Sequence, residues 1–398
     1  MPVSFITWDR RHALGSVFLV ACLLSLGSAF CFSQTPKRPA PSSTGPGYLA
    51  YSISANNPVP PHAPNFALVM LGGGDDVDEA TRFLCNHSGG GEIVVLRATG
   101  DDSYNSYFHD TCPQNSVTTL VISSAQGAGA PAVVQHIREV HAIFIAGGDQ
   151  SNYVKFWTGA ATQREINRAV ARGVPLGGIS AGLAVQGQFA FSALLDTVTS
   201  EEALANPFDP KITLDRNFLS VPPLAGIITD SHFSARQRMG RTIAFLARIL
   251  HDGWAIKARA IGIDQGTAVL VDHDNRATVV GNGSAYFIEL DHPPGLCEPG
   301  KPLTVKNIQV YDLSAKPKSN FDLSHWTGTG GRAFTLNVSD GIVQIPKPYG
   351  FLFWRSSTLH SQLVYNYKLS ALWFVALRTG EWPNPEIVSL KVGNKIPR

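Results

Sequence analysis

The sequence predicts an α/β fold in which helices sandwich a parallel sheet, with an antiparallel β region appended. Two observations support this. Short apolar runs alternate with helical patterns in the first half of the chain, as expected for strands buried on both faces. They are residues 66–71, 92–96, 117–122, 142–146 and 175–179. From about residue 260 the pattern changes to strands and turns, at 260–271, 277–280, 284–290, 305–313 and 334–343.

Composition allows one large core and argues against several kinds of partner. Of 398 residues, 44% are hydrophobic and 16% charged, and the formal net charge is +2. So small a charge, without a basic run interleaved with aromatic residues, predicts no nucleic-acid partner. No Cys and His residues stand at metal-ligand spacing. We therefore expect neither a metal nor a cofactor.

The two ends of the chain are predicted to lie outside the globular domain, which is placed at 64–345. Residues 1–33 carry basic residues ahead of an apolar run, which indicates a secretory signal peptide, and 34–63 is a Pro- and Ser-rich linker. We expect a secreted or periplasmic protein without stable membrane insertion after cleavage. A lipoprotein box ending at Cys22 and an uncleaved anchor are the alternatives. The tail, 346–398, either packs on the domain or mediates association, which allows a homodimer.

The cysteines permit one internal disulfide. Two of the five lie in the predicted signal peptide, and an odd number remains: Cys85, Cys112 and Cys297. An oxidising compartment would allow one pair to form, and Cys85 and Cys112 are the nearer pair in sequence. The sequence alone does not show that their side chains meet.

A Gly-x-Ser-x-Gly segment, residues 178–182, follows the apolar run at 175–179. Its glycines permit a tight strand-to-helix turn, which lifts the hydroxyl of Ser180 out of the sheet. The N–H of Ala181 would then point at a developing oxyanion. The segment predicts a nucleophilic serine.

Two further segments accompany this motif. An apolar run ends in Gly-Gly-Asp-Gln at 147–150, and Asp-Ser-His-Phe at 230–233 leads into an arginine-rich helix. In this order, the GGDQ, GxSAG and DxHFxxRxRxGR segments resemble the cyanophycinase and aspartyl-dipeptidase family of serine peptidases, over roughly 64–345. The resemblance implies a class I glutamine amidotransferase-like sheet. It also implies that Ser180 is the nucleophile and His232 its general base.

The resemblance carries further expectations about the site. It places Gly147 and Gly148 beside the oxyanion hole, together with Ala181. A base works best when an anionic group fixes its tautomer, and in the family this acid lies between serine and histidine. Glu202 is favoured and Glu201 is second. The interval also contains Asp196, Asp209 and Asp215. The alternative is that both glutamates start a helix, with Ser200 as its N-cap.

The arginines after the histidine suggest a substrate contact. Arg236, Arg238 and Arg241 lie at the start of the predicted helix, where positive charge opposes the helix dipole unless an anion compensates it. A substrate carboxylate would do so, and arginine can bind one through two hydrogen bonds. Salt bridges to nearby acids are the alternative. By resemblance, Gln150 and Asp230 also line the pocket.

The predicted activity is hydrolysis of a cyanophycin-like or isoaspartyl peptide bond through an acyl-enzyme. Ser231 stands where stricter cyanophycinases carry glutamine, so isoaspartyl dipeptides and other acidic peptides remain open as substrates. His232 acts as a base only when neutral, so activity is expected to rise with pH around the imidazole titration. An α/β-hydrolase-type esterase and a non-catalytic ligand-binding relative are the alternative functions.

Overall fold

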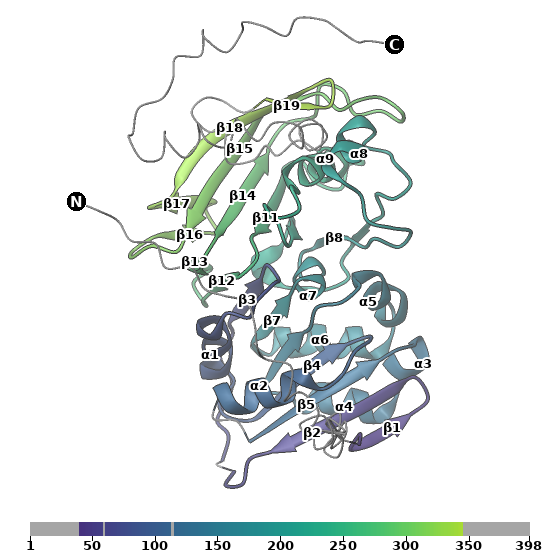
Figure 1. The fold of residues 1–398 in the computed structure, drawn as a ribbon, viewed down its shortest axis with the longest axis vertical. Coiled ribbons are helices and arrows are strands. Elements are labelled where there is room, and N and C mark those ends of the chain that lie inside the picture. The colour runs from purple at the N-terminus through teal and green to yellow at the C-terminus, as the bar shows by residue number, and fades with distance from the viewer. Residues whose placement is uncertain (1–39, 59, 113–114, 345–398) are drawn as a thin grey trace, which may run out of the picture. The chain divides into compact units, whose positions relative to one another are not determined.

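The computed structural model describes residues 40–58, 60–112 and 115–344 (Figure 1). The predicted signal peptide and the predicted tail, 346–398, lie outside the described residues. None of the helices in the described ranges is long and apolar enough to cross a membrane.

Part of the segment predicted to be a linker is folded. Within residues 34–63, β1 (Ser43–Gly45) and β2 (Tyr48–Ser54) form a hairpin, and β2 pairs antiparallel with β5 (Ser116–Ile122). Ala50 of β2 is buried in the core of the domain. The prediction of an extended linker is wrong for this stretch, because the hairpin adds two strands to the edge of the sheet.

The first sheet has a parallel centre, which confirms the five predicted strands. Eleven strands form this sheet. The parallel ones, in spatial order, are β5, β4 (Glu92–Arg97), β6 (Ala142–Ile145), β7 (Leu176–Ile179) and β3 (Leu68–Leu71). Antiparallel strands extend the sheet beyond β3: β12 (Thr267–Val271), β13 (Arg276–Gly281), β16 (Asn320–Asp322) and β17 (Thr327–Thr329).

Helices cover both faces of the parallel centre, as predicted. Side chains of β3 alternate between the two faces, because Leu68 and Met70 pack into one core and Val69 and Leu71 into another. The first core includes residues of α3 (Ala125–Ala128), α4 (Pro131–Glu139), α5 (Gln150–Trp157), α6 (Ala161–Ala171) and α7 (Ala181–Ala184). The second includes residues of α1 (Asp78–His87) and α2 (Ser103–Thr111), which Figure 1 shows together on one side of the sheet.

A second sheet of eight strands is mostly antiparallel. In spatial order it contains β19 (Ile342–Gln344), β18 (Arg332–Ser339), β15 (Val305–Ser314), β14 (Ser284–Leu290), β11 (Ala258–Ile263), β10 (Ile227–Asp230), β8 (Phe189–Phe191) and β9 (Leu214–Arg216). Only around β10 is the pairing parallel. The sheet packs against α9 (Met239–His251), which contacts α8 (Ser200–Ala205).

The β-rich region predicted from about residue 260 is divided between the two sheets. The chain leaves the second sheet after β11, turns at residues 264–266 and enters the first sheet as β12. The second sheet also begins earlier in the chain than predicted, with β8. These crossings matter for the site, because they bring strand ends from both sheets together.

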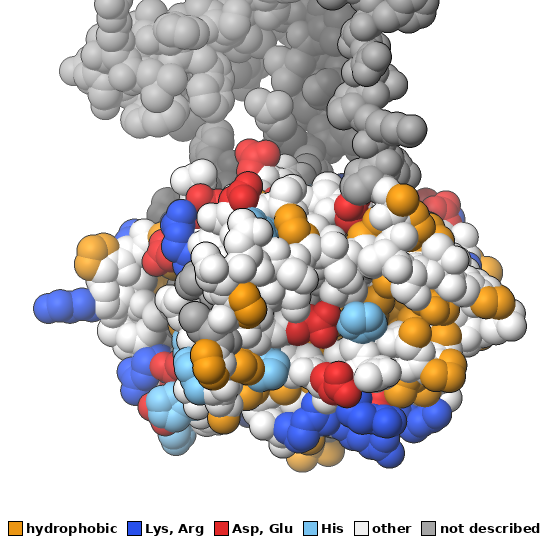
Figure 2. Space-filling model, turned by 90° about the horizontal axis from the view of Figure 1, so that it is seen from below, with side chains coloured by type: hydrophobic (Ala, Val, Ile, Leu, Met, Phe, Trp, Pro, Cys, Tyr) orange, Lys and Arg blue, Asp and Glu red, His pale blue; other side chains and the backbone are white. Residues whose placement is uncertain are grey.

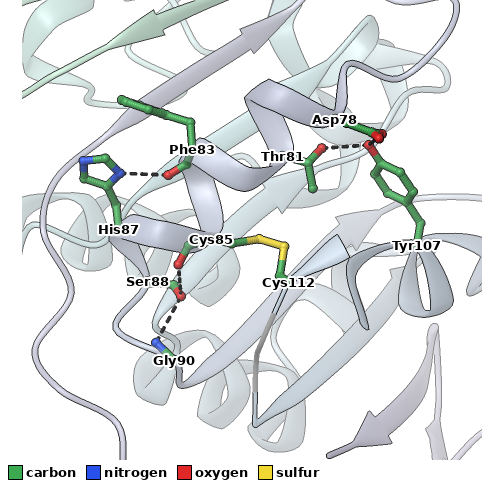
Figure 3. The surroundings of a disulfide bond; sticks show 9 residues. All are labelled: Asp78, Thr81, Phe83, Cys85, His87, Ser88, Gly90, Tyr107 and Cys112. Atoms are coloured by element: carbon green, nitrogen blue, oxygen red, sulfur yellow. Dashed lines mark hydrogen bonds between the residues drawn. A yellow bond between two sulfur atoms is a disulfide. The ribbon is translucent and has the colours of Figure 1, made fainter. Parts of the chain in front are cut away.

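A disulfide joins Cys85 of α1 to Cys112, which follows α2, with 5.9 Å between the two Cα atoms (Figure 3). Nearby, the hydroxyl of Tyr107 on α2 donates to the carboxylate of Asp78 on α1 (3.0 Å). This disulfide joins the two cysteines named from the sequence as the nearer pair along the chain. Cys297 is a buried free thiol.

Charged side chains are not spread evenly over the surface. Figure 2 shows Lys and Arg side chains gathered at one margin of the face seen from below Figure 1. Among the described residues, Arg138 of α4 and Arg168 of α6 both bind the buried carboxylate of Glu165, at 3.1 and 2.6 Å. Arg138 and Arg168 thus share one structural acid.

Candidate active site

Ser180 lies at a sharp turn between β7 and α7. Its backbone has φ 55° and ψ −109°, a conformation that non-glycine residues rarely adopt. The N–H of Ser180 donates to the carbonyl of Leu71 in the neighbouring strand β3 (3.0 Å). The turn directs the half-buried side chain away from the sheet, as the Gly-x-Ser-x-Gly motif predicts.

Both glycines of the motif are needed for close packing. A Cβ atom on Gly182 would overlap the carbonyl oxygen of Ile145 in β6. A Cβ on Gly178 would lie 2.7 Å from the carbonyl oxygen of Gly182. The short helix α7 therefore sits against the strands at a distance that only glycine permits.

His232 reaches the serine from the other sheet. It follows the end of β10 with φ 47°, and its N–H donates to the carbonyl of Gly72 at the end of β3 (2.7 Å). A Cβ on Gly73 would overlap the imidazole ring, so the glycine loop packs directly on it. Nε2 of His232 lies 2.7 Å from Oγ of Ser180. This is the distance and pairing of a nucleophile with its general base.

The turn after β6 also reaches the serine. A Cβ on Gly147 would lie 3.5 Å from the Cβ of Ser180. The hydroxyl of Tyr153 donates to the carbonyls of Ala146 (2.8 Å) and Gly147 (3.1 Å). Because N–H and C=O point in opposite directions within a trans peptide, the N–H groups of Gly147 and Gly148 point away from Tyr153. Burial raises the pKa of Tyr153, which keeps its hydroxyl a donor.

Ala181 is the first residue of α7 and is buried. The first N–H groups of a helix have no acceptor within that helix, so they are available to an anion. The three residues predicted for an oxyanion hole, Gly147, Gly148 and Ala181, therefore come from the two segments that flank Ser180.

The side chain that contacts Nδ1 of His232 is Gln265, not the predicted Glu202. Its Nε2 atom lies 2.7 Å from the ring nitrogen. Gln265 belongs to the turn between β11 and β12 and follows the histidine in the chain, outside the interval in which the acid was expected. Gln265 was also not predicted because its amide is neutral, whereas a search for a triad acid considers only Asp and Glu.

Glu202 forms the N-terminal capping box of α8 instead. Its carboxylate accepts from the N–H of Thr199 (2.8 Å) and from Lys211 Nζ (2.8 Å). Lys211 and then Thr199 lower the pKa of Glu202 to about 2. Glu201, the second choice, is exposed in the same helix. The helix-start alternative therefore describes both glutamates, with Thr199 rather than Ser200 as the N-cap.

Asp230 and two of the arginines form a buried ion cluster. Asp230 accepts two hydrogen bonds from Arg241, at 2.6 and 2.8 Å, and one from Arg238 at 3.1 Å. Thr242 donates to the same carboxylate (3.1 Å). Burial alone would raise the pKa of Asp230, but the guanidinium groups of Arg241 and Arg238 hold it below its usual value. Asp230 is therefore the ion-pair partner of both arginines, as the salt-bridge alternative expected.

Arg236 differs from the other two arginines. Its side chain is exposed and has no ion pair among the described residues. Its backbone N–H donates to the carbonyl of His232 (3.0 Å), so the backbone of Arg236 lies about one turn after the base. Gln150, the remaining predicted pocket residue, is the first residue of α5, and its amide donates to the carbonyl of Phe191 (3.4 Å).

The surroundings of His232 disfavour its protonation. Burial, followed by the positive charges of Arg236 and Arg238, lowers the pKa of His232 to about 4, although Asp230 opposes the shift. The imidazole is therefore neutral, and able to accept a proton, well into the acidic range. The sequence alone predicted that His232 would lose its proton near the ordinary imidazole pKa.

No group of three or more His, Cys, Asp or Glu residues in the described ranges could hold a metal ion.

A half-buried serine on a strand-to-helix elbow, paired with a histidine at the edge of an α/β sheet, is the site of a serine hydrolase. Residues 98–204 match the model of Peptidase family S51, a span that includes Ser180 and ends before His232.

Cyanophycinases are similar along most of their length. The cyanophycinases of Nostoc sp. and Trichormus variabilis are each 24% identical to this chain over 270 residues, covering 64% of the chain and 85% of each relative. That of Geminocystis herdmanii is 23% identical over 272 residues, covering 64% and 93%. The chain is thus similar to peptidase family S51 and to cyanophycinases, and it is a cyanophycinase-like serine hydrolase.

Solved structures of two peptidases are also similar. One is a peptidase from an acI-B1 Actinobacterium, with a TM-score of 0.44 and 14% identity, covering 65% of this chain and 97% of that one. The other is a putative peptidase E protein from Listeria monocytogenes, with a TM-score of 0.37 and 12% identity, covering 56% and 100%.

Proposed function

We propose that Ser180 is the nucleophile and His232 the general base of a peptidase that works through an acyl-enzyme. The observation that carries this proposal is the 2.7 Å contact between Oγ of Ser180 and Nε2 of His232. His232 takes the hydroxyl proton as Oγ attacks the scissile carbonyl carbon. It then gives that proton to the leaving amine, and water hydrolyses the ester that remains.

The oxyanion formed in this attack would be bound by backbone N–H groups of Gly147, Gly148 and Ala181. The hydrogen bonds of Tyr153 support this role, because they hold two carbonyls of the 146–148 turn on the side away from the proposed oxyanion. Donors fixed before the reaction need no reorganisation as the charge develops, which makes them effective.

The proposed substrate is a cyanophycin-like or isoaspartyl peptide. Its support is the similarity to cyanophycinases and the exposed charge of Arg236 close to the base. A guanidinium without an ion pair among the described residues can bind a substrate carboxylate through two hydrogen bonds. Asp230, Arg238 and Arg241 would act indirectly, by holding the end of β10 and the start of α9 in place.

Release of soluble dipeptide from purified cyanophycin tests this function, with isoaspartyl dipeptides and simple esters as parallel substrates. We expect cleavage of cyanophycin or of the dipeptides by the wild type. Ser180→Ala should reduce it by roughly 10⁴-fold or more. Turnover of the esters alone would favour an esterase, and an active Ser180→Ala variant would remove Ser180 from the mechanism.

We also propose that the protein acts in a secreted or periplasmic location. The disulfide between Cys85 and Cys112 supports this, because such bonds persist in oxidising compartments. Cell fractionation, with mass measurement of the mature N-terminus, tests the proposal. A cytoplasmic protein retaining residues 1–33 would contradict it.

A further inference from the structure

The second ring nitrogen of His232 has a neutral partner. The Gln265 amide lies 2.7 Å from Nδ1, on the side of the ring opposite Ser180. No carboxylate among the described residues hydrogen-bonds to this imidazole. Asp264, which precedes Gln265, is bound instead by the N–H groups of Ser234 (2.8 Å) and Ser284 (3.1 Å).

The turn that carries Gln265 is held firmly in place. The N–H of Gly266 donates to the carbonyl of Gly73 (2.9 Å), and the hydroxyl of Thr267 donates to the carbonyl of Gln265 (3.1 Å). A Cβ on Gly74 would lie 3.1 Å from the Cβ of Gln265, so the glycine loop also packs along this side chain. The amide is thus presented to His232 by backbone contacts on both sides.

The end of the amide that faces His232 decides which tautomer the ring adopts. If the NH₂ group donates to Nδ1, the ring proton lies on Nε2, which then cannot accept the proton of Ser180. If the amide turns by 180°, Oε1 accepts from Nδ1–H and leaves Nε2 free to act as the base. The two ends have nearly the same shape. No other hydrogen bond of this amide within the described residues holds it in the first orientation.

We propose that Gln265 is a positioning residue that holds His232 as its Nδ1–H tautomer through Oε1. The proposal rests on the proposed roles of Ser180 and His232. In the reaction, the Ser180 proton moves to Nε2 as the Oγ–C bond forms, and it leaves with the amine when the C–N bond breaks. Gln265 orients the ring throughout and neither gains nor loses a proton.

A neutral positioning residue differs from a carboxylate in its effect on charge. The groups that face His232 are Asp230, Arg236, Arg238 and Arg241, and the arginines outnumber the acid. Because Gln265 adds no negative charge, it fixes the tautomer without favouring the imidazolium form. The base then stays neutral in acidic solution, where a histidine paired with a carboxylate would already be protonated.

Two variants of Gln265 separate these effects. Gln265→Leu removes the acceptor, and Gln265→Glu keeps an acceptor and adds negative charge. Gln135→Leu, at an exposed position on α4, is the matched control. The first readout is the ¹⁵N spectrum of His232 at neutral pH, assigned by its loss in His232→Ala. The second is the rate at which a fluorophosphonate probe labels Ser180, measured from pH 3 to 9.

We expect wild-type His232 to carry its proton on Nδ1 and Gln265→Leu to lose this preference. Labelling of Ser180 in Gln265→Leu should be slower by roughly tenfold to a hundredfold, since an oriented base contributes at least that much. In Gln265→Glu labelling should persist, with its acid limb about one to three pH units higher. The control variant, Gln135→Leu, should match the wild type in both the ring spectrum and the labelling rate.

The outcomes distinguish this inference from the proposed function. An unlabelled Ser180 in the wild type would contradict the proposed function, while the ring spectrum would still decide the tautomer. Normal labelling and an unchanged spectrum in Gln265→Leu would overturn the role of Gln265 alone. If Gln265→Leu does not fold, an unshifted acid limb in Gln265→Glu would overturn it equally.

Discussion

Asp230 and Arg241 form a two-bond ion pair in the interior of the protein, with Nη2–Oδ1 at 2.6 Å and Nε–Oδ2 at 2.8 Å. The pair links the last residue of β10 to the first turn of α9. His232 lies between these two elements. The ion pair therefore supports the segment that presents the base to Ser180.

Removing one partner of this pair should destabilise the fold. Asp230→Ala leaves the guanidinium of Arg241 buried without its carboxylate, so we expect the free energy of unfolding to fall by about 3–5 kcal/mol. Urea unfolding measures this, with the exposed Asp274→Ala as the control. Unchanged stability combined with weaker substrate binding would instead return Asp230 to the role of a pocket residue.

Replacing Glu202 should have little effect on catalysis. Glu202→Gln weakens the capping box and the exposed ion pair with Lys211, whose combined contribution is about 1 kcal/mol or less. We expect kcat/KM within about threefold of the wild type, because nothing in these contacts reaches His232. Loss of a triad acid would cost about 10⁴-fold in kcat, so a loss of that size would restore Glu202 to the triad.

Activity should persist in acid solution. The base is active when neutral, and the pKa of His232 is lowered to about 4, so the acid limb of the rate profile should lie near pH 4 rather than near the ordinary imidazole value of about 6.5. Labelling of Ser180 by a neutral fluorophosphonate measures this limb without involving the natural substrate. A limb near the ordinary value would contradict the effect of burial and nearby arginines.

Removing the charge of Arg236 should move the acid limb of the rate profile to higher pH. The guanidinium disfavours protonation of His232, so Arg236→Gln raises the pKa of the imidazole and reduces labelling at low pH. Its KM for an acidic peptide should also rise, if Arg236 binds the substrate carboxylate. Arg164→Gln, at an exposed position on α6, is the control. An unmoved limb with a raised KM would assign Arg236 to substrate binding alone.

The disulfide should contribute measurably to stability. It closes a loop with a sequence separation of 27 residues, for which chain entropy predicts about 2–4 kcal/mol. We expect a double variant, Cys85→Ala with Cys112→Ala, to unfold at lower urea concentration, and reductant to affect only the wild type. Peptide mapping without reduction checks the pairing, and a linkage to Cys297 would contradict it.

Local patterns were sufficient for much of the fold and for the elbow at Ser180. The strand predictions for the parallel centre are confirmed because buried strands show as apolar runs whatever surrounds them. The elbow at Ser180 is similarly local, since its glycines are required by atoms within reach of the turn. Strands β1 and β2 were missed because a Pro- and Ser-rich context concealed a short edge hairpin.

The partners within the site could not be predicted in the same way. Arg238 and Arg241 meet Asp230 only because β10 and α9 fold back on each other. Sequence order suggested a glutamate before His232, yet helix capping uses Glu202. The turn carrying Gln265 is brought to the ring by strand pairing, and an amide in a turn has no pattern that distinguishes it from a surface residue.

The sequence by itself therefore predicted the hydrolase class, the nucleophile and base that we propose, and the central strands. The strands and the elbow at Ser180 depend on neighbours a few residues away, and the base was predicted from the resemblance of its segment to a known family. Only the tertiary structure decided which side chain contacts the second nitrogen of His232 and which charges surround the base. Those contacts join β3, β10 and the turn at 264–266, which lie far apart in the chain and meet only when both sheets have formed.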